Sequence, residues 1–151
     1  MNAPGCSMRR LLLALIISLA AGQLPHAQSL EDVVAIGDLW ACTVADFATM
    51  APALTEAMPD DAELAVRLEK TLSRYKAGQP LTKGRASLIA ARTLKLRSSF
   101  FYLVLPVQRY AFRAMVVDGV FAGTSSEGDV MSGVELLDFI TMITLKYAVA
   151  P

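Results

Sequence analysis

The run from Thr82 to Gly119 carries apolar side chains at the three- and four-residue spacing of an α-helix. One face of that helix would hold Ile89, Leu96, Phe100, Leu103, Val107, Tyr110, Ala114 and Val117. Between Phe100 and Val107 apolar residues occupy nearly the whole circumference, which is typical of a helix buried on several sides. We therefore expect this segment to be the central helix of the fold.

Pro106 interrupts the run. It removes one backbone donor, which costs about 3 kcal/mol inside a straight helix. Because the apolar spacing keeps its phase across the proline, we favour one kinked helix over two separate helices. Asp118 and Gly119 are expected to end it.

Two shorter helices are expected before this segment. The first begins at Ser29 and ends near Met50, and Pro52 either breaks it or starts a further turn. The second begins after Asp60 and closes at Gly78, which can take the left-handed conformation.

The central and last helices have clear start signals. Thr82 is placed as the N-cap of the central helix, and Ser132 with Glu135 forms a capping box for a last helix to about Ala148. Glycine and serine residues in 120–129 indicate a loop. The sequence thus predicts an all-α, small four-helix bundle-like domain with a kinked central helix.

The N-terminus has the features of a secretory signal peptide. Arg9 and Arg10 precede an apolar stretch, Leu11 to Ala21, and small residues follow it. We expect a signal peptide over residues 1–27, with the cleavage position left open, and one helical domain over residues 28–151. The domain would be exported, periplasmic or secreted, and an uncleaved anchor is the alternative.

Cysteine and histidine content restricts the chemistry. Cys6 would leave with the signal peptide, so Cys42 is either a small buried hydrophobe or the link of a disulfide-bonded homodimer. Its neighbours Trp40, Val44 and Phe47 favour burial. His26 is the only histidine and lies beside the expected cleavage sites. A mature chain without histidine lacks Ser-His and Cys-His catalysis and histidine metal sites.

One short motif could still suggest an enzyme. Ser73 and Lys76 match the S-x-x-K spacing of serine acyl-enzymes, but the companion K-T-G element is absent. We therefore predict a protein that is not an enzyme, with no catalytic residue, no metal site and no cofactor.

The charges are segregated although the net charge is zero. From Arg67 to Arg113 eleven residues are basic and only Glu69 is acidic, whereas the flanking segments are acidic. Such cations either bind a protein partner or an anion, or are neutralised by the acidic segments. The candidate binding residues are Arg67, Lys70, Arg74, Arg85, Arg92, Lys95, Arg109 and Arg113. Export argues against nucleic acid as a partner.

The apolar centre of the long segment suggests a second kind of site. Phe100, Leu103, Val107 and Tyr110, with Phe112, could line an apolar pocket, although packing as ordinary core is the alternative. The sequence thus predicts an exported, non-enzymatic helical domain that binds a protein partner in the cell envelope as an adaptor, inhibitor or assembly factor. The alternative is a carrier or sensor of an apolar or anionic amphiphile, a lipid or anionic small molecule held in the bundle.

Overall fold

The computed structural model describes residues 30–59, 61–96, 102 and 104–148, and the predicted signal peptide lies outside them. The described residues form six α-helices and a terminal π-helix without a β-strand, so the predicted all-helical class is confirmed. The elements are α2 (Leu30–Gly37), α3 (Val44–Ala57), α4 (Leu64–Leu72), α5 (Lys83–Thr93), α7 (Gln108–Val117), α8 (Gly133–Ile143) and η1 (Thr144–Ala148). None of the described helices is both long and apolar enough to cross a membrane.

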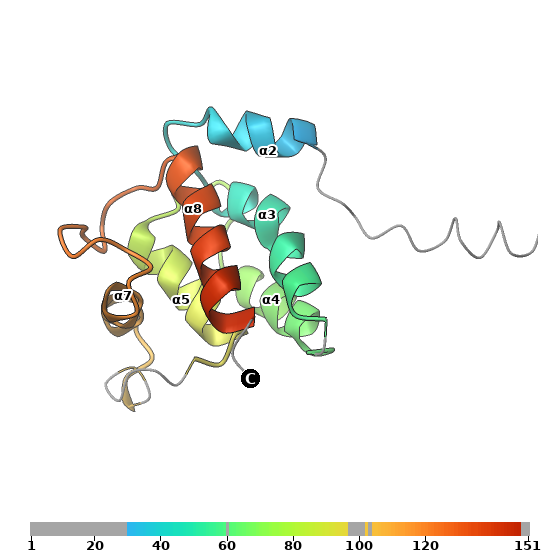
Figure 1. The fold of residues 1–151 in the computed structure, drawn as a ribbon. Helices are drawn as coiled ribbons and strands as arrows, with labels where there is room; N and C mark the ends of the chain where they lie inside the picture. The colour runs from blue at the N-terminus through green and yellow to red at the C-terminus, as the bar shows by residue number, and fades with distance from the viewer. Residues whose placement is uncertain (1–29, 60, 97–101, 103, 149–151) are drawn as a thin grey trace, which may run out of the picture.

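Helix α5 is the centre of this arrangement. Nine of its eleven residues are buried, and most of them are small, which lets the neighbouring helices approach closely. Helices α4 and α7 pack on α5, while α8 packs against α2 and α3 (Figure 1). A Cβ on Gly84 would lie 2.5 Å from the Gln108 side chain at the start of α7, so a larger residue there would require that side chain to move.

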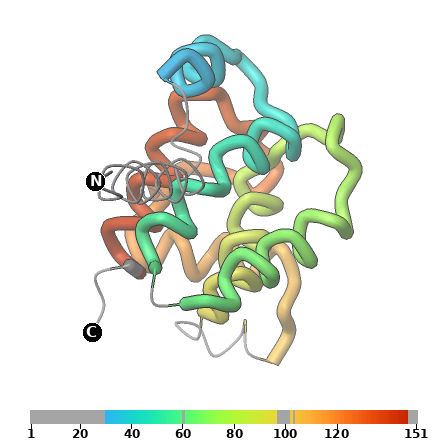
Figure 2. Tube along the Cα trace, turned by 90° about the vertical axis from the view of Figure 1, so that its right-hand side faces the viewer, coloured from blue at the N-terminus to red at the C-terminus, as the bar shows by residue number. Residues whose placement is uncertain are grey.

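Three extended segments meet where α3, α5 and α8 begin. The Cys42 N–H donates to the Met131 carbonyl at 2.7 Å, the Leu81 N–H to the Cys42 carbonyl at 2.8 Å, and the Met131 N–H to the Leu81 carbonyl at 2.9 Å. All three side chains are buried. Each residue precedes the N-cap of a helix, so these bonds bring three helix starts together at one end of the molecule, and α2 lies across that end (Figures 1 and 2).

The predicted caps of α5 and α8 are confirmed. The Thr82 hydroxyl accepts from the Arg85 N–H at 3.2 Å, and Ser132 and Glu135 form the reciprocal capping box. Gly119, at φ 71°, follows the end of α7 as expected. The 120–129 segment is a loop, and helical structure continues to Ala148 through η1.

The predicted single helix from Thr82 to Gly119 is wrong. Helix α5 ends at Thr93, Lys95 adopts a left-handed φ of 51°, and α7 starts only at Gln108. Pro106 therefore lies outside a helix, in the connection between α5 and α7, and kinks nothing. Two helices of about three turns can pack against each other, which one continuous rod cannot do.

The predicted helix from Ser29 to Met50 is also divided, into α2 and α3. The break at residues 38–43 frees backbone groups for long-range bonds: the Leu39 carbonyl accepts from the Gly133 N–H at 2.7 Å, and Cys42 joins the meeting point of the three helix starts. The break also turns Trp40 outwards, and its side chain is 90% exposed. The expected packing of Trp40 around Cys42 is therefore wrong.

Two predicted helix ends differ from the structure. Pro52 lies inside α3, and α4 ends at Leu72 instead of at Gly78. Gly78 does not have a positive φ, so it is not a left-handed cap. Residues 73–79 form turns because backbone groups at 77 and 79 bond to the start of α3, through the Ala45 and Val44 N–H groups.

Candidate binding site in the α7 cleft

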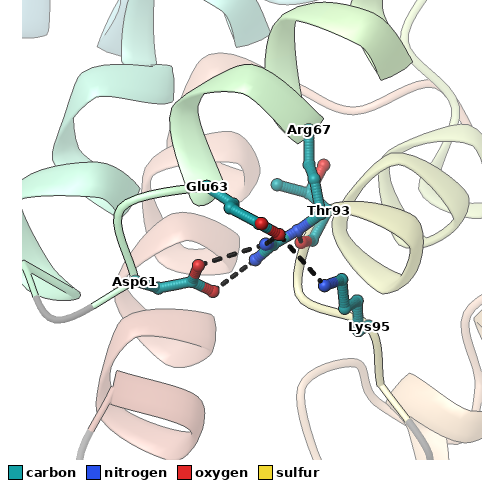
Figure 3. Close-up of polar contacts among 5 residues, drawn as sticks. All are labelled: Asp61, Glu63, Arg67, Thr93 and Lys95. Carbon is teal, nitrogen blue, oxygen red and sulfur yellow. Dashed lines mark hydrogen bonds and ion pairs between the residues drawn. The ribbon is translucent and has the colours of Figure 1, made fainter.

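Two of the eight predicted cations are compensated where α4 meets the end of α5. The Arg67 guanidinium pairs with Asp61, lies 3.5 Å from a Glu63 oxygen and donates to the Thr93 carbonyl at 2.8 Å (Figure 3). The Lys95 ammonium lies 3.5 Å from the same Glu63 carboxylate. The Arg67 guanidinium lowers the pKa of Asp61 below its usual value. These charges join two helices, so they offer little free positive charge to a partner.

The other α4 and α5 cations are dispersed. Arg85 donates to the Pro80 carbonyl, and Arg92 donates to the Pro106 carbonyl at 3.4 Å. Each arginine therefore links α5 to a neighbouring connecting segment. Lys70 and Arg74 are exposed, on α4 and the following turn, and form no ion pair within the described part of the chain. The structure therefore separates the predicted surface into parts on different helices.

Arg109 and Arg113 lie together, one helical turn apart on α7. Both are exposed, and both line an open cleft of about 550 Å³ between α7 and the 120–129 loop. We call this hollow the α7 cleft. Its lining residues are Arg109, Phe112, Arg113, Val116, Val117, Gly123, Ser125, Ser126 and Glu127. Figure 1 shows α7 nearly end-on with this loop beside it.

Within the described residues, the two arginines have no carboxylate as an ion-pair partner. Asp60 is the only Asp or Glu outside these residues. Like charges at positions i and i+4 repel each other by about 0.2–0.5 kcal/mol, so the pair does not stabilise α7. Glu127 lines the same cleft and offsets part of the positive charge.

The loop wall of the cleft is held by backbone hydrogen bonds to α5. The Gly84 N–H donates to the Glu127 carbonyl at 3.0 Å, and the Lys83 N–H donates to the Asp129 carbonyl at 2.9 Å. Within the loop, the Ser126 N–H donates to the Asp129 carboxylate at 2.8 Å. The wall is therefore fixed to the most buried helix of the fold.

Lys83 is a second link between this loop and the core. Its buried ammonium lies 2.9 Å from a Glu135 oxygen and 3.6 Å from an Asp129 oxygen, and it donates to the Ser125 hydroxyl at 3.3 Å. Burial alone would raise the pKa of Glu135, but bonds from the Ser132 N–H and Lys83 lower the pKa overall. Lys83 is thus neutralised and adds no free charge to the cleft.

Of the four residues predicted to form an apolar pocket, only Val107 and Tyr110 lie within the described part of the chain. Phe100 and Leu103 lie outside the described residues. Val107 is largely exposed and Tyr110 half-buried, and neither lines the α7 cleft. Phe112 does line the cleft, and its ring centroid lies 5.5 Å from that of Phe121, which stacks on Phe139 in the core.

The structure describes the surroundings of Cys42 and Ser73, the two nucleophilic side chains considered in the sequence. Cys42 is 1% exposed, and burial raises the pKa of its thiol to about 11, so the buried alternative is confirmed. A disulfide to a second copy would require this site to open. The described residues hold no group of three or more His, Cys, Asp or Glu side chains that could bind a metal ion. Ser73 lies beyond the end of α4, and its hydroxyl donates to the Lys70 carbonyl.

Comparison of the chain with protein-family models, with curated proteins and with solved structures finds no match. The function therefore has to be argued from the residues themselves.

The loop half of the α7 cleft is absent from the sequence predictions. Ser125, Ser126 and Glu127 were recognisable as a loop, but nothing local indicates which helix that loop will face. The i, i+4 spacing of Arg109 and Arg113 was the one sequence signal for this site, because the spacing places both side chains on one face of a helix.

Proposed function

We propose that this protein is an exported, non-enzymatic binding domain that docks a protein partner in the cell envelope through the α7 cleft. The observation that carries the proposal is the pair Arg109 and Arg113, which forms no ion pair within the described residues and lies beside an apolar floor. Arginine is enriched at protein interfaces, whose fully buried centres are more apolar than the rest of the surface, and a charged patch orients the partner as it approaches. Export rests on the N-terminal sequence alone.

A photo-crosslinking experiment in intact cells tests this proposal. Val117 lines the cleft and is 84% exposed, so a photo-crosslinking amino acid at this position should trap the partner as an adduct of discrete mass. The same amino acid at Val66, exposed on α4 away from the cleft, is the matched control. We expect the adduct at Val117 only, and in the envelope fraction. No adduct at Val117, or equal labelling at both positions, would refute docking at this cleft.

The amphiphile carrier remains the second candidate function. The α7 cleft also combines cations with apolar residues, as a site for an anionic amphiphile would. The cleft is open to solvent, however, whereas lipid carriers bury most of the ligand surface. Native mass spectrometry of the purified protein distinguishes the two, since a carrier would retain lipid and a protein-docking domain would not.

A further inference from the structure

We propose that the α7 cleft recognises a single carboxylate that the partner presents beside an apolar side chain of its peptide chain. This inference rests on the proposed protein-docking function and names the chemical group that is bound. The guanidinium group is planar and offers paired N–H donors that match the two oxygens of a carboxylate. Arg109 and Arg113, one turn apart, can approach such a group from two sides.

The apolar residues of the cleft indicate which kind of residue lies next to the carboxylate in the ligand. Phe112, Val116 and Val117 line the cleft next to the two arginines, and Val117 is largely exposed. Covering this surface removes apolar area from water at about 25 cal/mol per Å². A ligand with a charge alone would leave Val117 in water. In a peptide with an acidic residue adjacent to an apolar residue, the carboxylate can pair with the two arginines while the apolar side chain covers the apolar floor.

Glu127 limits the charge and the class of the ligand. Glu127 lines the same cleft, so its negative charge lies near the two arginines and would oppose a ligand with two or more negative charges. A carboxylate also accepts hydrogen bonds, and peptide N–H groups supply donors close to an acidic side chain. The combination of two cations and one anion therefore favours a peptide segment with one carboxylate over a phosphate or a polyanion.

The cleft is formed before the ligand arrives. Its loop wall is bonded to α5 through Gly84 and Lys83, and the Lys83 ammonium holds Ser125. A preformed site does not have to order a loop on binding, which reduces the free-energy cost of association. Short peptides should therefore bind measurably.

The test uses the purified protein and two isosteric peptides, acetyl-Ala-Leu-Glu-Ala-amide and acetyl-Ala-Leu-Gln-Ala-amide. Amide NMR titrations should show shifts in Arg109–Val117 and in 123–127, and a Kd about tenfold lower for the Glu peptide, since hydrogen bonds to a charged group are stronger than hydrogen bonds to a neutral amide. Replacing Leu by Ser in the Glu peptide should also weaken binding. The double variant Arg109→Gln, Arg113→Gln should lose the Glu preference.

The control removes the same charge elsewhere. Lys70→Gln with Arg74→Gln changes two exposed cations outside the cleft and should leave the Kd unchanged. Equal Kd values for the two peptides, shifts outside the cleft, or no binding would overturn the inference. Inorganic phosphate that binds as tightly as the Glu peptide would reveal a general anion site and overturn it too. A Val117 adduct in cells combined with any of these results would retain protein docking and reject only the carboxylate assignment.

Discussion

Glu135 connects three parts of the molecule through one carboxylate. It accepts from the Ser132 N–H at the start of α8 and pairs with Lys83 at the start of α5, whose ammonium also holds Ser125 of the cleft loop. A glutamate that follows a serine by three residues was predictable as a capping box. Its pairing with a lysine far earlier in the chain was not, because that contact exists only after α5 and α8 have packed.

Stability should depend on pH through Glu135. Its folded pKa lies below the ordinary value, so its contribution is fully present above the unfolded pKa of about 4.3 and is lost as the pH falls through the folded pKa. Glu135→Gln keeps the capping geometry but removes the charge, and should cost about 1 kcal/mol near pH 7, since the carboxylate is partly exposed. Urea unfolding should show this difference shrinking towards about pH 3.

Glu69→Gln is the matched control for this measurement. Glu69 is an exposed glutamate of α4 whose carboxylate forms no ion pair within the described residues. Its substitution should change the free energy of unfolding little at either pH. A stability difference for Glu135→Gln that persists unchanged in acid would contradict the assigned role of its charge.

At the level of elements, α8 starts directly against the end of α2. A Cβ on Gly133 would lie 1.7 Å from the Ile36 carbonyl oxygen, so no side chain fits there without a backbone shift. Gly133→Ala should therefore destabilise the fold by about 1–3 kcal/mol, the range found for overpacking. Thermal and urea unfolding measure this loss.

Gly78→Ala is the matched control, for which we expect no loss of stability. A Cβ on Gly78 would meet no atom within 4 Å, and the residue has no positive φ. Alanine there should be neutral or stabilise the fold by about 0.4–1 kcal/mol, because it restricts the unfolded chain. Equal destabilisation by the two substitutions would contradict the close approach of α2 and α8.

On the scale of the whole molecule, Trp40 offers a direct check on how the chain is arranged. It is the only tryptophan, and the break between α2 and α3 leaves it 90% exposed. Because its surroundings are already aqueous, acrylamide should quench its fluorescence almost equally in the folded and urea-unfolded protein. Far-UV circular dichroism should lose its helical signal in one cooperative transition, as small domains usually do. Strong protection of Trp40 in the folded state would show that this surface is covered.

How much of the structure the sequence predicts depends on how far apart in the chain the interacting residues lie. Helical periodicity, the caps at Thr82 and Ser132 and the left-handed Gly119 after α7 depend on residues within one or two turns, and all are present in the structure. The same periodicity continued across 38–43, 94–96 and 105–107, where the described chain leaves the helix. Apolar spacing carries no information on whether the backbone continues, and it does not ensure burial, since Val107 and Val117 of the predicted apolar face are largely exposed.

By itself, the sequence determined the helical class, the cap positions and a pair of arginines on one helix face, because each is a local property of neighbouring residues. Only the tertiary structure decided where the long apolar runs divide and that Trp40 faces solvent. It also decided that Arg109 and Arg113 line an open cleft, whereas Arg67 and Lys95 form ion pairs. The physical reason is that long-range contacts compete with local helix formation for the same backbone and side-chain groups. Backbone groups at 39 and 42 bond to partners at 133 and 131, far along the chain, and each charge pairs with whichever carboxylate the packing of the helices brings near.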